Sequence, residues 1–292
     1  MPDSPTMLKP EIARLEHHLR ALVGERNPLT SLDQLHRCGR YIEASLQDSG
    51  LRMEREEVPF NGTLSHNILG FKAGSDPSRG TFVLAAHYDS VQGTPGADDN
   101  ASAVAALLET ARCLEPVRLG ATLLFASFTL EEYGFVGCRH FLAGAHRRKD
   151  RFRGMVSMEM IGFRNGEPGS QSFPPYVDAS RYPDRGNFLA AVGNEPSRAL
   201  TESLAQGMQT AHPRLPVHTL IVPGRGDAFT EVRLSDHSPF WEVGVPAVML
   251  TDTAFFRNPH YHQPTDTLET LDLEFLQDGT RAMAGFLERH LT

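Results

Sequence analysis

The sequence predicts an α/β protein in which a central mixed, mainly parallel sheet lies between two layers of helices. Apolar runs of strand length alternate with segments of helical periodicity along the 292 residues. Several apolar runs end abruptly in polar side chains, namely His87 and Asp89, the pair Glu131-Glu132, and Glu159. Because open α/β sheets keep their chemistry at the carboxyl ends of their strands, we expect these side chains to meet at one edge.

The N-terminal part predicts helices and a hairpin. Apolar residues at helical spacing predict covering helices at 10–23 and 31–49, with Asn27-Pro28 between them. Residues 51–60 and 65–71 predict two strands around the turn Asn61-Gly62. The length fits a single α/β sheet, so we expect one domain over 1–292, in which residues 1–50 form the covering helices.

The stretch from Val83 to Asp89 predicts a buried strand that ends in His-x-Asp, followed by the turn 96–102 and a helix from Ala101 to Leu114. His87, Asp89 and Asp99 would then occupy one small volume, which suits a hard divalent metal. Asp98 and Asn100 are predicted to be turn and cap residues. Spacing alone does not distinguish Asp98 from Asp99.

The remaining chain repeats the strand–helix alternation. Strands are expected at 121–129, 155–159, 217–222 and 245–251, and helices at 136–146, 196–211 and 270–291. The segment 162–186 is rich in Gly, Pro, Ser and Asp, and a second polar stretch runs from Gly224 to His237. We expect the loops 162–186 and 223–240 to rim the site and to form the substrate pocket.

Composition limits the partners. Lys and Arg total 28 against 36 Asp and Glu, for a net charge of −8, and the one basic cluster is Arg147-Arg148-Lys149, so nucleic acid is not expected as a partner. Cys38, Cys113 and Cys138 are expected to be core residues in a reducing compartment. Residues 1–6 lack a signal-peptide pattern and no apolar run approaches membrane-spanning length, so we expect a cytoplasmic protein without a membrane partner. The oligomeric state stays open.

Acids and histidines at successive strand ends predict a metal site. Uncompensated carboxylates in one cleft repel one another unless cations neutralise them. A further histidine-rich stretch, residues 258–267, follows the last strand. A bridging carboxylate with one histidine and one acid for each ion is the ligand set of a two-metal hydrolase.

With these segments the chain resembles the M28 family of zinc aminopeptidases. The matching pieces run in family order across residues 65 to about 275: Ala86-His87-Tyr88-Asp89-Ser90, Pro95 to Ser102, Thr129-Leu130-Glu131-Glu132-Tyr133-Gly134, Met158 to Gly162, Ser235 to Phe240, and Tyr261-His262 with Asp266-Thr267. Two departures are Glu159, where several members have Asp, and Ala103, where many have Gly. The first keeps a carboxylate.

The resemblance implies a role for each candidate. His87 and Glu159 would bind one zinc, Glu132 and His262 the other, and Asp99 would bridge the two ions. Glu131 would be the general base. Asp89 would fix the tautomer of His87, and Tyr261 would stabilise the oxyanion. The peptide bond between Asp99 and Asn100 would be cis.

The function expected from this set is the removal of the N-terminal residue from peptides with a free N-terminus, with two Zn²⁺ per chain. Within enzymes, the alternative is a glutaminyl-peptide cyclotransferase with one zinc, and a different class is a metal-free, non-catalytic relative. His260 is expected to be a loop residue. Asp236 and His237 either line the cleft or anchor their loop, and the sequence does not separate these readings.

Overall fold

The computed structural model describes residues 7–148 and 150–292. Residues 1–6, on which the expectation about a signal peptide rests, and Lys149 of the basic cluster lie outside the described residues. The described strands form one eight-stranded sheet in the order β1-β2-β4-β3-β5-β8-β6-β7. Their bounds are β1 Arg52–Phe60, β2 Thr63–Lys72, β3 Thr81–His87, β4 Thr122–Phe128, β5 Phe152–Glu159, β6 Leu189–Asn194, β7 Val217–Val222 and β8 Ala247–Thr251.

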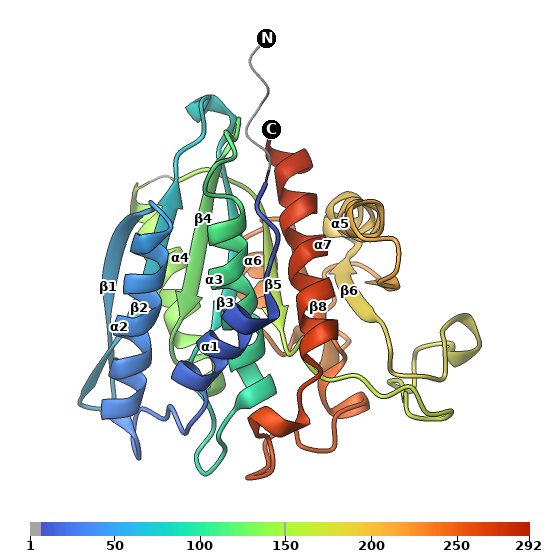
Figure 1. The fold of residues 1–292 in the computed structure, drawn as a ribbon. Coiled ribbons are helices and arrows are strands. Elements are labelled where there is room, and N and C mark those ends of the chain that lie inside the picture. Colours follow the sequence, from blue (N-terminus) through green and yellow to red (C-terminus); the bar gives the residue numbers. More distant parts are fainter. Residues whose placement is uncertain (1–6, 149) are drawn as a thin grey trace.

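The centre of the sheet is parallel. Strands β4, β3, β5 and β8 are parallel neighbours, whereas β1 and β2 form an antiparallel hairpin at one edge. At the other side β6 runs antiparallel to β8 and parallel to β7. The prediction of a mixed, mainly parallel sheet is therefore confirmed. All four central strands point their carboxyl ends to the same edge, at the bottom of Figure 1.

Helices cover both faces of the sheet. Their bounds are α1 Ile12–Leu22, α2 Leu32–Asp48, α3 Ala103–Cys113, α4 Val136–Arg148, α5 Arg198–Ala211, α6 His237–Glu242 and α7 Leu273–Leu291. Helices α1, α2, α3, α5 and α7 share one apolar core with the sheet, and α4 and α6 share a second core on the opposite face (Figure 1). The sheet and the helices packed on its two faces therefore form the three predicted layers.

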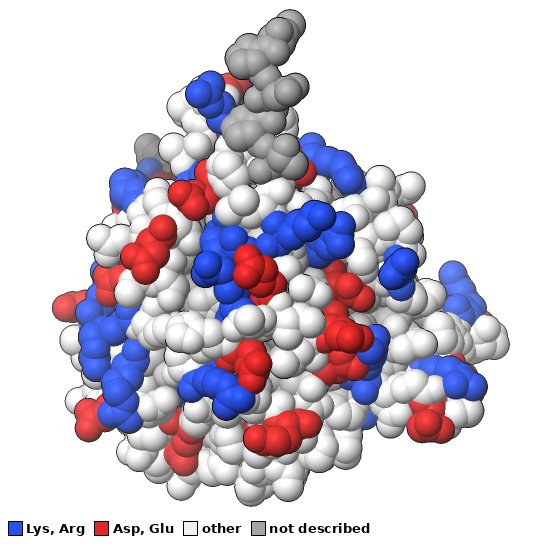
Figure 2. All heavy atoms as spheres, viewed as in Figure 1, with Lys and Arg blue, Asp and Glu red and all other residues white. Residues whose placement is uncertain are grey.

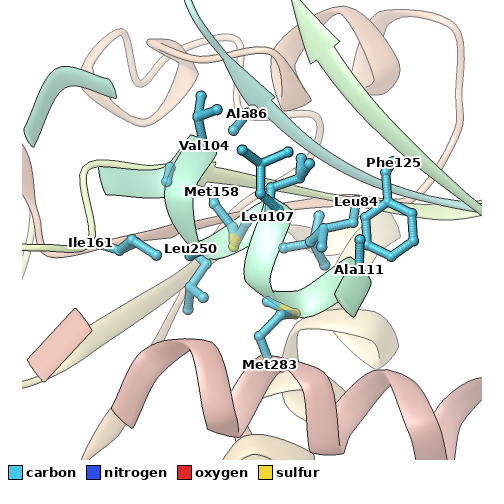
Figure 3. Close-up of a cluster of buried hydrophobic side chains, with 14 of the residues drawn as sticks. Leu84, Ala86, Val104, Leu107, Ala111, Phe125, Met158, Ile161, Leu250 and Met283 are labelled. Carbon is cyan, nitrogen blue, oxygen red and sulfur yellow. The ribbon is translucent and has the colours of Figure 1, made fainter. Parts of the chain in front are cut away.

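Strand β3 shows why its sequence is apolar throughout. Phe82, Leu84 and Ala86 lie in the first core, whereas Val83 and Ala85 lie in the second, and all five are fully buried. Alternate side chains of a strand point to opposite faces, so a strand covered on both sides needs apolar residues at every position. Figure 3 shows Leu84 and Ala86 of this strand beside Leu107 of α3.

Two elements were not predicted. β6 is a short run of mostly small residues, Leu-Ala-Ala-Val-Gly-Asn, which periodicity alone does not assign to strand or helix. Helix α6 begins at His237, the last residue of the polar stretch that starts at Gly224, and continues to Glu242. The segment between β5 and β6 is irregular, as predicted, apart from one bridge between Asn165 and Gly186 and a single turn at Ala179–Arg181.

Three further expectations concern the surface and the cysteines. Cys38, Cys113 and Cys138 are buried and free, as predicted. Within the described residues, no helix combines the length and the apolar character needed to cross a membrane. On the face viewed in Figure 2, acidic and basic side chains are interspersed without a broad area of one sign.

Candidate metal centre

The candidate ligands gather at the carboxyl edge of the central strands. His87 ends β3, Glu159 ends β5, and Glu131-Glu132 begin the single turn after β4. His262 comes from the loop that follows β8. Since β4, β3, β5 and β8 are parallel neighbours, their loops meet at this edge, as Figure 1 shows.

Asp99 lies between two imidazoles. Its Oδ1 is 3.3 Å from His87 Nε2, and its Oδ2 is 3.1 Å from His262 Nε2. On one side, His87 Nε2 is 3.4 Å from Glu159 Oε1, and on the other, His262 Nε2 is 3.3 Å from Glu132 Oε2. The five expected ligands thus form two groups of one histidine and one glutamate, which share Asp99.

Glu131 lies within the same cluster. It is 8% exposed, and one ligand-type atom from each of His87, Glu131 and Glu159 lies within 4.8 Å of the other two. The same holds for His87, Asp99 and Glu132. Distance alone therefore does not distinguish Glu131 from the ligands, and its separate role comes only from the resemblance.

Asp89 holds the turn that carries the two glutamates. Its Oδ1 accepts from the backbone N–H of Glu131 at 3.0 Å, and its Oδ2 accepts from that of Glu132 at 3.3 Å. The turn begins at Leu130, whose φ of 60° directs the chain sharply away from β4. Asp89 Oδ1 also lies 3.5 Å from His87 Nδ1. The carboxylate thereby fixes the glutamate pair, a role that the sequence did not suggest.

The loop that carries Asp99 is fixed from two sides. The Asp266 carboxylate accepts from the backbone N–H groups of Asp98 and Asp99, at 2.9 and 3.1 Å. The Asn100 amide donates to Met158 O and its oxygen accepts from Met160 N–H, at 3.0 and 2.9 Å. The bond between Asp99 and Asn100 is cis, as expected.

The prediction that Asp98 and Asn100 are turn and cap residues was wrong. Asp98 is fully buried; its Oδ1 accepts from Gly162 N–H at 2.9 Å, and its Oδ2 accepts from the Asn258 amide at 2.8 Å. The Asp98 side chain therefore reaches the segments after β5 and β8, and that of Asn100 bonds the end of β5 and the residue after it. Such long-range partners give no signal in the local sequence.

Two neighbours orient the outer ligands. Ser235 Oγ donates to Glu159 Oε2 at 2.8 Å, and the ring of Tyr261 stacks on that of His262 with 3.7 Å between the centroids. Sequence reasoning did not single out Ser235, although it lies in the quoted segment Ser235 to Phe240. The stacking limits the rotation of the His262 ring.

The remaining histidines and Asp236 take different places. His237 anchors its loop, since its Nε2 lies 2.8 Å from Val232 O. Asp236 is fully buried, and neither of its carboxylate oxygens has a hydrogen-bond partner in the part of the chain that the structure describes. His260 contacts Thr265 Oγ1 through Nδ1 at 2.9 Å, which agrees with the expectation of a loop residue.

The electrostatics of the cluster fit a cation. Burial and the neighbouring Asp99 charge raise the pKa of Glu132 to about 7, and burial with the nearby carboxylates raises that of Glu131 well above its usual range. Burial opposes protonation of His262, but Asp99 and Glu132 outweigh it and raise the His262 pKa to about 10. Buried carboxylates whose pKa values rise in this way are groups that a bound cation would stabilise in the charged form.

The donor atoms also fit. Among the described residues, neither Asp99 Oδ1 nor Glu132 Oε1 has a hydrogen-bond partner, although both atoms are buried. Buried polar atoms are almost always paired, so two such carboxylate oxygens beside two imidazoles fit a positively charged ligand. Carboxylate and imidazole ligands suit zinc, among other divalent ions.

Comparisons with known proteins agree with this site. The model of peptidase family M28 matches residues 67–287. The uncharacterized protein YfbL of Escherichia coli (strain K12) is 33% identical, over 94% of this chain and 86% of its own length. Aminopeptidase YwaD of Bacillus subtilis (strain 168) is 28% identical over 75% of this chain, which spans only 43% of YwaD.

Solved structures share the fold. LapA of Legionella pneumophila matches 96% of this chain and 72% of its own with a TM-score of 0.74 at 20% identity. BSAP, a zinc aminopeptidase from Bacillus subtilis, matches 80% of this chain and 52% of its own with a TM-score of 0.61 at 25% identity. A glutaminyl cyclase of Porphyromonas gingivalis matches 96% of this chain and 97% of its own with a TM-score of 0.70 at 18% identity.

The family model covers most of the chain, and the strand-end acids and histidines that it spans meet in one buried cluster. The chain therefore belongs to peptidase family M28, and its fold is that of the M28 aminopeptidases.

Proposed function

We propose that this protein is a zinc aminopeptidase that hydrolyses the N-terminal peptide bond of peptides, with two zinc ions held in one catalytic domain. The observation that carries the proposal is the position of Asp99 between His87 and His262, each paired with its own glutamate. His87 and Glu159 would hold one ion, Glu132 and His262 the other, and Asp99 both. Relatives named as zinc enzymes support zinc as the metal.

The chain's own residues would carry the proton transfers. When bound, the ions would supply Lewis-acid activation of the water and the scissile carbonyl. Glu131, buried beside His87, would take the proton of the attacking water and pass it to the leaving amine. Asp89 would keep Glu131 in place through its backbone N–H.

Tyr261 is the candidate for the oxyanion. It stacks on His262 at the border of the cluster, and burial raises the pKa of its hydroxyl, so this group stays protonated and can donate. A donor directed at the developing negative charge stabilises the transition state more than the substrate.

The alternatives predict different metal contents. A glutaminyl cyclotransferase would hold about one zinc per chain and release no amino acid, and a non-catalytic relative would hold none. The complete set of five candidate ligands in one cluster favours the two-zinc hydrolase.

The test compares two adjacent glutamates with the same substitution. We expect Glu131→Gln to keep its zinc and to lower kcat by a factor of about 10² to 10⁴, which is the range for a general base. Glu132→Gln should lose zinc and activity together, because it removes a charged ligand. The measurements are zinc per chain by atomic emission and initial rates on aminoacyl-anilides, blocked peptides and N-terminal glutaminyl peptides.

Each result separates the readings. Loss of metal in Glu131→Gln but not in Glu132→Gln would mean that Glu131 is the zinc ligand and Glu132 the general base. Hydrolysis of blocked substrates alone would refute an aminopeptidase. An Asp99→Asn variant that keeps two ions would refute the bridging role.

A further inference from the structure

A second group of buried polar side chains lies next to the metal cluster. Its members are Asp98, Asp252, Arg257 and Asn258, which are 0 to 6% exposed and which we call the rear cluster. None of them has a role in the metal binding or the proton transfers proposed above. Charged side chains are costly to bury, so three of them in one place indicate that the rear cluster holds something in position.

Asp252 joins the loops that follow β5 and β8. It is the first residue after β8, and its Oδ1 accepts from the backbone N–H of Ala254 at 2.9 Å. Its Oδ2 accepts from the backbone N–H of Phe163 at 3.0 Å. Thr253 and Ala254 have φ values of 84° and 47°, a region that residues other than glycine occupy only where the surroundings hold them. Asp252 therefore fixes the course of the chain from β8 toward His262.

Asn258 joins the loop after β8 to the loop of Asp99. Its amide donates to Asp98 Oδ2 at 2.8 Å, and its Oδ1 accepts from the backbone N–H of His260 at 2.9 Å. One side chain thus connects the carboxylate next to Asp99 with the turn that presents His262. These two ligands come from loops that are more than 150 residues apart in the sequence.

Arg257 supplies the positive charge of the rear cluster. Its Nε donates to Gln171 Oε1 at 2.9 Å, and its guanidinium lies 4.7 Å from the centroid of the Phe188 ring. Burial lowers the pKa of Arg257 to about 10, against the effect of Asp252 and Asp98, so the group stays charged at neutral pH. Burial and the nearby Asp98 raise the pKa of Asp252, and Arg257 opposes this rise. The guanidinium therefore reduces the repulsion between the two acids.

The position of Asp98 sets that of Asp99. Asp98 Oδ1 accepts from Gly162 N–H and its Oδ2 from Asn258, whereas the next carboxylate in the chain faces the two histidines. Adjacent residues share a rigid peptide unit, so a displacement of Asp98 also displaces Asp99. Side chains that hold metal ligands from behind commonly determine how tightly the metal binds.

We propose that the rear cluster holds Asp99 and His262 in place for metal binding, so that its four members are positioning residues of the metal centre. This inference rests on the two-ion site of the proposed function and adds residues that set its zinc affinity. None of the four would touch an ion or the substrate. The bond between Asp98 and Asn258 gives the sharpest test, because it can be broken and then rebuilt.

The first test exchanges the two partners of this bond in the full chain. In Asn258→Asp, two carboxylates face and repel each other, although the new side chain still accepts from His260 N–H. We expect the zinc affinity of the folded protein, measured by competition with a chelator, to fall by about 10- to 100-fold. In the double variant Asp98→Asn with Asn258→Asp, an amide again donates to a carboxylate with the direction reversed. This variant should regain most of the lost affinity.

Asn194→Asp is the matched control. Asn194 is 2% exposed, like Asn258, and its amide donates to Arg225 O at 3.4 Å. It ends β6, which runs antiparallel to β8, so it lies at the opposite edge of the sheet from the metal cluster. The control should lower Tm and keep the wild-type zinc affinity. The same result for Asn258→Asp, or a double variant that binds zinc no better than the single one, would overturn the proposal.

The second test removes the positive charge, and it also decides the question if Asn258→Asp does not fold. Arg257→Met should lower zinc affinity by about tenfold or more, because Asp98 and Asp252 lose the charge that compensates them. Arg257→Lys keeps a charge and should lose less. Arg198→Met on α5, where the Arg198 side chain is 54% exposed and pairs with Glu202, is the control and should bind zinc as the wild type does. A folded Arg257→Met protein with wild-type zinc affinity would overturn the proposal.

Zinc binding and turnover together separate this inference from the proposed function. If the wild type binds two zinc ions but cleaves no aminoacyl-anilide, and the variants lose affinity as described, the aminopeptidase function fails and the positioning role stands. If the wild type cleaves anilides and the rear-cluster variants keep its zinc affinity, the positioning role alone fails. Amide hydrogen exchange in residues 258–267 should be faster in Asn258→Asp than in the wild type, which reports the released loop without turnover. Unchanged exchange there would contradict the link through Asn258.

Discussion

Arg26 offers a test of how the N-terminal helices support the metal centre. It follows α1, is 1% exposed, and lies outside residues 67–287, the part of the chain that the family model matches. Its guanidinium donates to five backbone carbonyls, those of Leu22, Gly24, Tyr88, Pro95 and Gly96, at 2.7 to 2.9 Å. Three of these carbonyls lie on the loop that connects His87 to Asp99.

The expected loss of stability in Arg26→Met follows from which carbonyls would be left without a donor. In Arg26→Met, Pro95 O and Gly96 O keep the N–H groups of Gly24 and Ala101 as donors. Tyr88 O and Gly24 O have no other donor among the described residues. A buried acceptor without a partner costs about 1 to 3 kcal/mol, which applies in full to Tyr88 O, whereas Gly24 O is part-buried and should cost less, so the two together cost about 2 to 4 kcal/mol. At about 2 to 4 °C per kcal/mol for a chain of this size, Tm should fall by roughly 4 to 16 °C.

The assay measures unfolding by circular dichroism and zinc affinity by competition with a chelator. Zinc affinity should fall as well, because the loop between His87 and Asp99 loses its anchor. Arg20→Met is the matched control on α1, where the Arg20 side chain is 65% exposed and forms an ion pair with Glu16, and it should change stability by less than about 1 kcal/mol. An Arg26→Met protein with wild-type Tm and zinc affinity would refute the reasoning.

Two further predictions concern the same loop and α6. Gly96→Ala should lower both stability and zinc affinity, since φ is +62° and the new Cβ would clash with the backbone oxygen of Asp99. Gly93→Ala, at a φ of +82° in open space, should cost only the roughly 1 to 2 kcal/mol of the left-handed conformation. Equal losses in both variants would contradict the close contact. Burial lowers the pKa of His237 to about 4, below its value in the unfolded chain, so the unfolded state binds the proton first and stability falls as pH drops from about 6.5 to 4, by about 1.4 kcal/mol per unit. Urea unfolding at several pH values across this range measures the loss of stability. If the stability of a His237→Gln protein falls with pH as steeply as that of the wild type, His237 does not cause the loss.

Much of the candidate site could be predicted from the sequence because its residues follow strands. Val83 to His87 is apolar at nearly every position, which indicates a strand covered on both faces, and the polar side chains begin where it ends. Neighbouring parallel strands must bring such ends together. The segments at His87, Glu131-Glu132 and Glu159 therefore had to meet at one edge, whatever the details of packing.

Other features had no local signal. β6 is too short and too rich in small residues for its periodicity to identify it, and its place beside β8 depends on pairing with a strand more than 50 residues away. Arg26 resembles any polar loop residue in the sequence. Only the packed structure shows that it is buried and bound to five carbonyls.

Asp98 and Asp99 show most clearly what the sequence determined and what the tertiary structure decided. The sequence by itself determined that an acid in this turn belongs to the site, because the turn follows a strand that ends in His87 and Asp89. Which acid points to the histidines was decided by tertiary structure. Asp266 and Asn100 fix the loop from opposite sides, so Asp98 turns toward Gly162 and Asn258 while Asp99 faces His87 and His262. Asp266, Met158, Gly162 and Asn258 lie 58 to 168 residues from the residues they bond in this turn, and the contacts that select one carboxylate over its neighbour exist only after the segments have packed together.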